Sequence, residues 1–533
     1  MSTPLQTSLW MPIGKLGTLP VPNLQDYAQA RHQFSWQHLH AELVERADGR
    51  MNMAHIAVSM HALATPDKLA LRFLDRQWRT EDLTYRALNA RANQFANLLS
   101  AVGSEHGSVV CALLGRCPEL FVTVLGAIKQ GAIFSPLFTA FGPEPIRSRL
   151  ELASTSVLVT TATLYVRKVA PIRASLPALR HVFVICDPGQ VPPPDTEELG
   201  ALLVRQSESF DTHFADPDDP ALLHFTSGTT GKPKGVLHAH RAVIAHYATA
   251  RLALDLHRDD VFWCTADPGW VTGISYGVLA PLACGVSSII DREEMDVERW
   301  YSLLARERVS VWYTAPTALR MLMRAGLEFA HRHRYPALRL IASVGEPLNP
   351  EVVVWGVEAF GIPIHDTWWQ TETGAIMIAN FVSQPVWPGS MGYALPGVEA
   401  AIAQRREDGT VVLLGPNEVG EIVLRSGWPS MFKTYLNDGE RFARCFAGAW
   451  YFTGDEARCD EHGRFWFMGR SDDVIKSSGH LISPFEVESV LNQHAAVLQS
   501  AVIGLPDAVM GHVVRALIEL KPGHEASPEL RRD

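Results

Sequence analysis

TSGTTGKPKG, residues 226–235, is the most informative stretch of this 533-residue chain, and it follows the apolar run Ala221–Phe225. It holds four hydroxyl side chains, three glycines and two lysines. Glycine lets backbone N–H groups approach an anion closely, while hydroxyl and ammonium groups add donors and positive charge. A flexible surface loop is the plainer alternative, but linkers rarely place two lysines beside a proline. The composition therefore indicates a loop that binds a polyphosphate.

Two common kinds of phosphate loop do not fit this stretch. A Walker A loop needs Gly, four residues and then Gly-Lys-Ser/Thr, whereas Pro233 follows Gly231-Lys232 and Thr226 stands where the first glycine belongs. A dinucleotide site of the Rossmann kind is disfavoured because the chain contains no Gly-x-Gly pair. The loop therefore indicates a nucleotide enzyme of a third kind.

The loop resembles the signature of the adenylate-forming superfamily, which comprises acyl-CoA synthetases, luciferases and peptide-synthetase adenylation domains. Further segments agree with that family in order and spacing, and the resemblance runs from about Leu83 to the end of the chain. These segments are Gly345-Glu346-Pro347, Trp369-Gln370-Thr371-Glu372-Thr373-Gly374, Tyr451-Phe452-Thr453-Gly454-Asp455 and Gly469-Arg470-Ser471-Asp472-Asp473.

Within the family, the chain is most similar to acetate–CoA ligases. This resemblance implies ATP-dependent ligation of a short-chain carboxylic acid, acetate and then propionate, to coenzyme A. The reaction would pass through an acyl-adenylate and release AMP and pyrophosphate, with ATP, Mg²⁺ and coenzyme A as cofactors.

The composition fits an enzyme that acts on small molecules. A net charge of −10 argues against a nucleic-acid or membrane-surface partner, and 47% hydrophobic residues are ordinary for a globular protein. The seven cysteines form no Cys-x-x-Cys pair or zinc pattern, so we expect reduced, mostly buried thiols. Met1–Asn23 lacks the pattern of a secretory signal, and no run of about 18 apolar residues occurs. We expect a cytoplasmic enzyme, either a monomer or a homo-oligomer.

Strand-like and helix-like segments alternate from about residue 80 to 375, which predicts an α/β fold with mostly parallel sheets. We expect a large N-terminal domain, residues 1–469, with two α/β sheet subdomains and a β-rich subdomain at about 397–469. A small, mobile α+β C-terminal domain, residues 470–533, would follow a hinge near Asp472 and would be incomplete. The expected strands are Val109–Leu114, Ser156–Thr160, His181–Cys186, Val261–Thr265, Val309–Tyr313, Glu421–Leu424, Phe465–Phe467, Ala501–Leu505 and Val513–Leu520, with helices at Glu119–Ile128 and from Ser483.

The resemblance assigns a role to each matching residue around the nucleotide. The phosphates would be bound by Thr226, Ser227, Gly228, Thr229, Thr230, Gly231 and Lys234. Thr371 would contact the α-phosphate, and Glu372 would hold Mg²⁺, since a hard cation prefers a carboxylate. The adenine would lie against Gly345, Glu346, Pro347, Asp366, Thr367 and Trp368, with Gln370 among the nucleotide contacts. Asp455 would accept hydrogen bonds from the ribose hydroxyls, and Arg470 would reach the ribose or a phosphate.

The same resemblance places the acid and the thiol. Trp369 would form the floor of the acyl pocket, with Val271, Thr272 and Val344 as its walls. Because an indole fills the space that a longer acid needs, bulky acids should be rejected. Trp270 and Gly479 would line the channel for the pantetheine arm of coenzyme A.

The chain departs from the family pattern in two places, and the first of them lowers the expected rate of adenylation. The family ends with a Pro-x-x-x-x-Gly-Lys segment whose lysine bridges the substrate carboxylate and the α-phosphate, and that segment does not occur before Asp533. Loss of one such preorganised donor typically costs about 10²–10³ in rate. Leu481 also replaces an arginine that many relatives carry after Ser-Gly-His/Tyr.

Three alternatives stay open at this point. Gly273-Ile274-Ser275-Tyr276-Gly277 matches Gly-x-Ser-x-Gly of serine esterases, but the preceding Pro268–Thr272 reads as a loop rather than as a strand. A nucleotide-binding pseudoenzyme without the C-terminal lysine is the second alternative. A ligase for a medium-chain or aromatic acid is the third.

Overall fold

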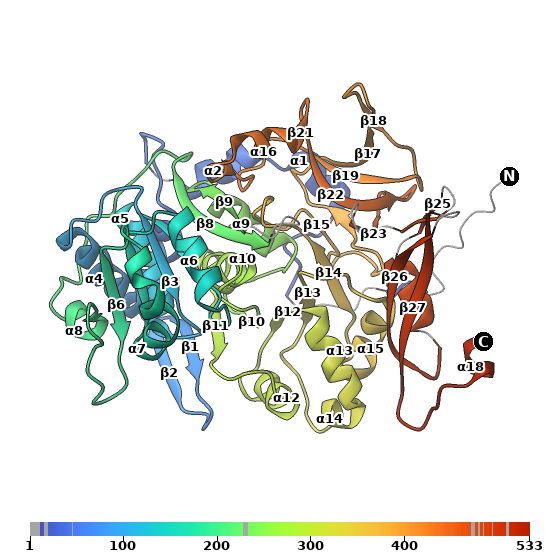
Figure 1. Cartoon of the computed structure of the whole chain (residues 1–533), viewed down its shortest axis with the longest axis horizontal. Coiled ribbons are helices and arrows are strands. Elements are labelled where there is room, and N and C mark those ends of the chain that lie inside the picture. Colours follow the sequence, from blue (N-terminus) through green and yellow to red (C-terminus); the bar gives the residue numbers. More distant parts are fainter. Residues whose placement is uncertain are drawn as a thin grey trace.

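The computed structural model describes residues 11–14, 20–44, 46–227, 233–470, 475–477, 480–482, 484–492, 494–507 and 511–532. Within these residues the strands pair into sheets of nine, eight, six and four strands. Figure 1 shows the order in space: the eight-stranded sheet lies at one end, the six-stranded sheet lies along one side, and the C-terminal strands stand at the other end.

The eight-stranded sheet carries the strands that flank the glycine-rich loop. Its central strands are continuous apolar runs, because helices cover both faces of a parallel sheet. β8 and β9 pair antiparallel, and their register sets Thr226 opposite Lys234. In spatial order the strands are β20 (Thr434–Tyr435), β9 (Pro233–Ala239), β8 (Pro220–Ser227), β4 (Ile133–Pro136), β3 (Val109–Leu113), β5 (Val157–Thr161), β6 (His181–Ile185) and β7 (Glu197–Glu198).

The nine-stranded sheet combines two distant parts of the chain. β1 pairs parallel with β11, so that Leu71 lies opposite Ser288, and β2 closes that edge antiparallel to β1. The strands between β11 and β14 are parallel, and their carboxyl ends meet at one edge. In spatial order the strands are β16 (Tyr393–Ala394), β15 (Ile378–Ala379), β14 (Ile364–Trp368), β13 (Leu340–Ser343), β12 (Val311–Thr314), β10 (Val261–Cys264), β11 (Ser287–Asp291), β1 (Leu69–Leu74) and β2 (Thr80–Thr84).

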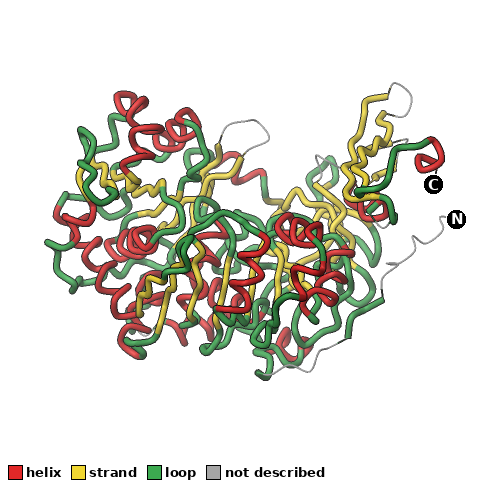
Figure 2. The backbone as a smooth tube through the Cα atoms, turned by 90° about the horizontal axis from the view of Figure 1, so that it is seen from below, coloured by secondary structure: helices red, strands yellow, loops and turns green. Residues whose placement is uncertain are grey.

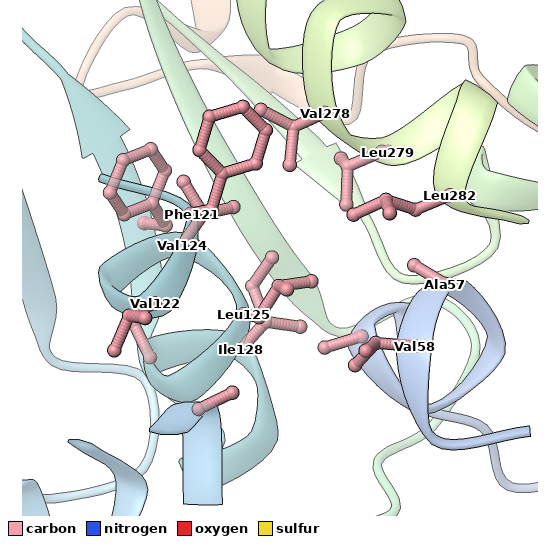
Figure 3. Close-up of a cluster of buried hydrophobic side chains, with 14 of the residues drawn as sticks. Ala57, Val58, Phe121, Val122, Val124, Leu125, Ile128, Val278, Leu279 and Leu282 are labelled. Atoms are coloured by element: carbon pink, nitrogen blue, oxygen red, sulfur yellow. The ribbon is translucent and has the colours of Figure 1, made fainter. Parts of the chain in front are cut away.

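Helix α5 (Pro118–Gln130) lies in the hydrophobic core that joins these two sheets. Proline occupies its first turn, Gly131 ends it in the left-handed conformation, and nearly every residue between them is buried. Figure 3 shows Phe121 and Leu125 of this helix near Val278 and Leu282. A core of this kind makes the two sheets one packing unit.

The remaining helices cover the two large sheets or connect their strands. They are α1 (Tyr27–Gln33), α2 (Trp36–Leu43), α3 (Met60–Ala64), α4 (Tyr85–Ala101), α6 (Pro143–Leu152), α7 (Ala162–Leu164), α8 (Leu199–Leu203), α9 (Ala242–Leu252), α10 (Val271–Ile274), α11 (Ala280–Ala283), α12 (Val297–Arg306), α13 (Pro316–Ala325), α14 (Leu327–His331) and α15 (Pro350–Phe360). Shorter π and 3₁₀ segments are η1 (His55–Ser59), η2 (Tyr165–Val169), η3 (Ala170–Ser175) and η4 (Ser275–Leu279).

The six-stranded sheet forms the β-rich part of the chain. It contains β18 (Val411–Leu413), β17 (Ala400–Arg405), β19 (Val419–Arg425), β22 (Trp450–Cys459), β21 (Phe446–Ala447) and β23 (Phe465–Arg470), with helix α16 (Gly439–Arg444) beside it. Asp460 and Gly463 form the turn between β22 and β23, as expected for that hairpin, because Gly463 N donates to Asp460 O.

A small α+β unit ends the chain. It contains β24 (Ile475–Ser477), β25 (His480–Ile482), α17 (Pro484–Leu491), β26 (Val497–Asp507), β27 (Gly511–Leu520) and α18 (Pro528–Arg532). Figure 2 shows β26 and β27 projecting at one end of the molecule. The predicted fold class is confirmed: two α/β sheets, a β-rich part and a small α+β unit. The domain limits, 1–469 and 470–533, remain a proposal.

Two local predictions are wrong. The thiols are free as expected, but only Cys111 and Cys284 are buried, because most cysteines lie at the ends of elements rather than inside the sheets. Val271 and Thr272 belong to a helix rather than a loop, since α10 begins directly after Trp270. No helix among the described residues combines the length and the apolar character needed to cross a membrane.

Candidate active site

A cavity of about 650 Å³ lies at the carboxyl ends of β13 and β14, beside the β8–β9 hairpin. Open α/β sheets bind ligands at this edge. The cavity brings together Thr226, Lys234, Trp270, Val271, Thr272, Val344, Gly345, Glu346, Pro347, Asp366, Thr367, Trp368, Trp369, Gln370, Thr371, Glu372, Asp455 and Arg470, as the motifs predict. Met391, Phe467, Gly469, Pro484 and Glu488 complete its lining.

The other predicted site residues lie outside what the structure describes. They are Gly228, Thr229, Thr230, Gly231, Asp472 and Gly479. Ser227 is placed as the last residue of β8, without a description of its side chain.

Asp366 lies in the middle of β14 and is held by neutral donors. Ser343 Oγ and the backbone N–H of Thr367 both donate to its Oδ1, at 2.8 and 2.9 Å. Burial raises the pKa of Asp366 to about 7, and these two hydrogen bonds oppose the shift. The carboxyl is therefore fixed in the wall of the cavity rather than paired with a cation.

Asp455, on β22, reaches the same wall from the β-rich part. Its Oδ2 accepts hydrogen bonds from Trp368 Nε1 at 3.0 Å and Gln370 Nε2 at 2.9 Å, and Arg470 Nη1 lies 3.8 Å from Oδ1. Burial raises the pKa of Asp455 to about 6, although Arg470 and the two hydrogen bonds lower it. One oxygen is thus committed to the protein, while the other faces the arginine.

Glu346 lines the cavity but is also held by α13. Thr317 Oγ1 donates to both carboxylate oxygens, at 2.8 and 2.6 Å, and Arg320 Nη2 lies 2.7 Å away. Gly345, before it, has a φ of 88° and open space where a Cβ would lie. Only glycine adopts this conformation without strain, so Gly345 sets the direction in which the chain leaves β13.

Glu372 and Lys234 form the polar end of the cavity. Tyr435 Oη donates to Glu372 Oε1 at 2.8 Å, and Lys234 Nζ lies 5.9 Å from the centre of the Tyr435 ring. Sequence reasoning missed Tyr435, because its two-residue strand β20 reaches this place only by pairing with β9. The sequence around it, Lys433-Thr434-Tyr435-Leu436, contains no motif that would have found it.

The carboxylate of Glu372 suits a hard cation such as Mg²⁺. Among the residues that the structure describes, no group of three His, Cys, Asp or Glu side chains is placed to hold a metal ion. A cation at Glu372 would therefore take its remaining oxygen ligands from a bound phosphate or from water.

Trp369 closes the apolar end of the cavity and is held on two sides. Its Nε1 donates to Tyr313 Oη at 3.1 Å, and its ring meets Tyr276 edge-on at 5.1 Å between centroids. Tyr313 Oη in turn lies 2.8 Å from Thr367 Oγ1, and burial raises the pKa of Tyr313. Because the Tyr313 hydroxyl stays protonated and partnered, it holds the indole from one side while the Tyr276 ring packs against the other.

The turn that carries Thr371 and Glu372 is held by hydrogen bonds to its backbone carbonyls. His246 Nε2 contacts Gly374 O at 2.9 Å, while Trp428 Nε1 and Ser430 Oγ donate to Thr373 O at 2.8 and 2.7 Å. Burial lowers the pKa of His246 to about 3, so its ring is neutral and its Nε2 carries the proton that Gly374 O accepts.

Trp270 stands at the opening of the cavity and is 37% exposed. Its ring lies 5.4 Å from that of Phe138 and 6.0 Å from that of Phe141. Ser275, by contrast, is buried inside the helical segment after α10, not on a turn between a strand and a helix. A nucleophile needs an exposed hydroxyl at such a turn, so the geometry does not fit a serine esterase.

A protein-family profile described as AMP-binding enzyme matches residues 58–436, which is most of the chain. The chain belongs to the AMP-binding enzyme family. A second profile, AMP-binding enzyme C-terminal domain, matches residues 486–533 of this AMP-binding enzyme. The first match includes the cavity residues from Thr226 to Met391, and the second includes Glu488 of the α+β unit.

Several enzymes whose names describe CoA synthetases or ligases resemble this AMP-binding enzyme over nearly its whole length. The acetyl-coenzyme A synthetase of Bacillus subtilis (strain 168) is 42% identical over 521 residues, which are 96% of this chain and 88% of the relative. The crystal structure of a Brucella canis acyl-CoA synthetase matches with a TM-score of 0.80 and 35% identity, covering 96% and 91% of the two chains. An anthranilate CoA ligase, AuaEII, in complex with anthranoyl-AMP matches with a TM-score of 0.81 and 28% identity, covering 91% and 89%.

Proposed function

We propose that this AMP-binding enzyme ligates acetate to coenzyme A at the expense of ATP, with propionate as its second substrate. Acetate takes the adenylyl group from ATP and pyrophosphate leaves. The thiol of coenzyme A then displaces AMP from the acetyl-adenylate. The similarity to acetyl-coenzyme A synthetases over most of the chain supports the reaction.

The observation that carries the proposal is the fixed indole of Trp369. Its Nε1 donates to Tyr313 and its ring packs edge-on with Tyr276, and both contacts oppose a rotation that would admit a longer acid. Val271, Thr272 and Val344 line the same cavity as Trp369. Interiors resist added volume, and one unwanted methylene in such a pocket costs about 1–3 kcal/mol.

In the first half-reaction the chain mainly positions charges, since phosphoryl transfer depends on geometry and electrostatics. Thr226, Ser227 and Lys234, with Gly228, Thr229, Thr230 and Gly231, bind the β- and γ-phosphates, and Thr371 contacts the α-phosphate. Mg²⁺, carried by ATP, neutralises phosphate charge beside Glu372. The adenosine is held by Gly345, Glu346, Pro347, Asp366, Thr367, Trp368, Gln370, Asp455 and Arg470.

In the second half-reaction the pantetheine arm enters past Trp270, whose partly exposed ring stands at the cavity opening. Gly479 lies along this arm. The C-terminal domain, residues 470–533, turns about Asp472 between the two half-reactions. Pro484 and Glu488 of the small domain line the cavity. This position supports a part for the rotation of the domain in the reaction.

The protein's setting is also a proposal. Seven free cysteines support a reducing compartment, so we place the enzyme in the cytoplasm as a monomer or homo-oligomer. A ligase for an aromatic acid is the runner-up, because an anthranilate CoA ligase has the same fold. The volume of Trp369 argues against it.

The test is thioester and AMP formation from acetate, propionate, butyrate and benzoate. In the native protein, acetate should have the highest kcat/KM. Trp369→Gly should lower the preference for acetate over butyrate by about tenfold or more, since it removes the volume that rejects the longer chain. If Trp369→Gly still prefers acetate to the native extent, the pocket assignment is wrong.

A matched pair of variants tests how the indole is held. Tyr313→Phe removes the hydroxyl that accepts a hydrogen bond from Trp369 Nε1 and contacts Thr367 Oγ1. The bond to the indole is worth about 1 kcal/mol, so the acetate-to-propionate preference should fall up to about fivefold. Tyr301→Phe is the control, because the Tyr301 hydroxyl is buried without a hydrogen-bond partner in the described residues and lies in a different hydrophobic cluster. An equal change in both variants would mean that Tyr313 acts through stability alone.

A further inference from the structure

A second cavity, of about 450 Å³, opens from the active site on the phosphate side. It shares Lys234, Gln370, Glu372 and Arg470 with the first cavity, and no residue of the acyl end lines it. Its other walls come from β17, β19, β20, α16 and β22. The volume lies in the range of sites for small molecules.

The lining is strongly cationic. It contains five cationic side chains and two carboxylates, although the whole chain has a net charge of −10. The cations are Lys234, Arg405, Arg441, Arg444 and Arg470. Like charges that converge in a cavity raise the free energy of the empty site, and an anion that enters removes this cost.

The two carboxylates of the lining are already engaged by other groups. Glu372 accepts a hydrogen bond from Tyr435 Oη at 2.8 Å, and Glu421 accepts one from the backbone N–H of Gly454 at 2.6 Å. Burial further raises the pKa of Glu421. Neither carboxylate forms an ion pair with an arginine of this cavity within the described residues.

Arg441 is the arginine whose field reaches the catalytic lysine. Its guanidinium and the Lys234 ammonium each lie 5.9 Å from the centre of the Tyr435 ring. Burial lowers the pKa of Lys234, and Arg441 lowers it further. Within the described residues, the carboxylate at ion-pair distance from Arg441 is that of Asp438, the residue that caps α16, at 3.8 Å.

Arg444 lies one turn further along α16, on the side of Arg405. The Arg405 guanidinium stacks 4.4 Å above the Phe452 ring and donates from Nη1 to the Arg444 carbonyl at 3.3 Å. Arg405 is thereby held in place without a carboxylate. A wall that carries guanidinium groups suits the oxygen atoms of a phosphate.

We propose that this cavity is the exit site for pyrophosphate. It rests on the proposed function: once acetate has taken the adenylyl group, the pyrophosphate moves from Lys234 towards Arg441 and Arg444 and is held there before it leaves. Affinity at this site then sets how strongly the product inhibits the enzyme and how readily the first step reverses.

The test compares Arg441→Gln and Arg444→Gln with Arg425→Gln in the full chain. Arg425 is an exposed arginine on β19 that pairs with Glu399 and lines neither cavity, so it controls for the loss of one surface charge. Calorimetry measures binding of pyrophosphate and of inorganic phosphate, and steady-state kinetics measures inhibition of acetyl-CoA synthesis by pyrophosphate. Thermal unfolding verifies that each variant folds.

We expect Arg441→Gln and Arg444→Gln each to weaken pyrophosphate binding and inhibition by about tenfold or more, because each removes charge-assisted hydrogen bonds. The KM for ATP should change by less than about threefold, since Lys234 and the glycine-rich loop bind the triphosphate. Arg441→Lys should recover part of the affinity, because it keeps the charge.

Two results overturn the proposal: pyrophosphate affinity equal in Arg441→Gln and Arg425→Gln, or equal losses for pyrophosphate, AMP and coenzyme A. If Arg441→Gln fails to fold, Arg444→Gln carries the test, because it leaves the ion pair between Arg441 and Asp438 intact. If the protein fails to make acetyl-CoA at all, the proposed function fails, while calorimetry with pyrophosphate still reports on the exit site.

Discussion

At the scale of the residue, the two aspartates of the cavity are the groups whose chemistry burial alters most. Asp366 is bonded to neutral donors only, whereas Asp455 faces Arg470. Burial raises the pKa of both carboxyls, to about 7 and about 6 respectively. Both values lie within the range in which enzymes are usually assayed.

This shift predicts a pH dependence for nucleotide binding. A carboxyl with a raised pKa takes up its proton at a higher pH than an ordinary aspartate does, so Asp455 becomes neutral as the pH falls through about 6. A neutral carboxyl is a poorer acceptor for ribose hydroxyls. The KM for ATP should therefore rise roughly tenfold for each pH unit below 6, in steady-state assays between pH 5 and 8.

Asp455→Asn provides the matched measurement. Its KM for ATP should be raised at pH 8 and should change little between pH 7 and 5, because the titrating group is gone. Asp366→Asn distinguishes the contribution of the second carboxyl. Any inflection near pH 7 in the plot of the KM for ATP against pH should vanish in that variant alone. If the KM for ATP of Asp455→Asn still rises with a midpoint near pH 6, the pH dependence does not come from Asp455.

The residues that sequence could predict are those in continuous motifs. Trp369, Glu372 and Asp455 stand in short stretches whose spacing is informative on its own. Tyr313 and Tyr435 could not be found this way. Each acts through a partner 56 or 63 positions away, and sheet pairing rather than local pattern brings the partners together.

At the scale of the element, the turn from Gln370 to Gly374 depends on one glycine. Gly374 has a φ of 71°, and a Cβ there would lie 2.4 Å from Ser430 O and 2.9 Å from His238 Cε1. The substitution Gly374→Ala would combine backbone strain of roughly 1–2 kcal/mol with a clash against backbone. Adenylate formation should fall by about 10² or more, as the turn moves Thr371 and Glu372.

Gly361→Ala is the control for that prediction. Gly361 has a φ of 79° at the end of α15, with nothing within 4 Å of a Cβ, so the variant carries the strain without the clash. It should lower the free energy of unfolding by about 1–2 kcal/mol in urea titrations and leave activity unchanged. Equal loss of adenylation in both variants would point to strain rather than to the displaced turn.

Secondary structure was predictable where an element is buried as a whole. β3, β6 and α5 follow from continuous apolar runs and helical spacing, because burial on all sides leaves one solution. Helix α10 could not be predicted, because Pro268 and Gly269 just before it are typical of a loop. Strands of two residues, such as β20, carry no periodicity at all.

At the scale of the whole molecule, the C-terminal unit contributes little to the main core. The hydrophobic clusters of the described residues include nothing beyond Phe467. Arg324 and Glu519 form an ion pair from α13 to β27, 3.0 Å long, with both side chains about half exposed. Such a pair is worth about 0–1 kcal/mol.

We therefore expect a chain that ends at Arg470 to fold. Its unfolding midpoint should lie within about 4 °C of the full chain, a shift that roughly 1 kcal/mol produces in domains of 150–250 residues. It should still bind ATP, because the adenosine contacts lie before residue 471, and it should make no acetyl-CoA. Calorimetry and scanning fluorimetry measure both properties. An insoluble fragment would place the domain limit elsewhere.

The pairing of β1 with β11 has a consequence for the growing polypeptide on the ribosome. Leu71 is made about 220 residues before its partner Ser288. At roughly 5–20 residues per second, β1 emerges some ten to forty seconds before that partner exists. During this interval the edge of β1 that will pair with β11 is unpaired, and its apolar side chains are exposed to other nascent chains. A chaperone that shields newly made strands should therefore raise the yield of this protein.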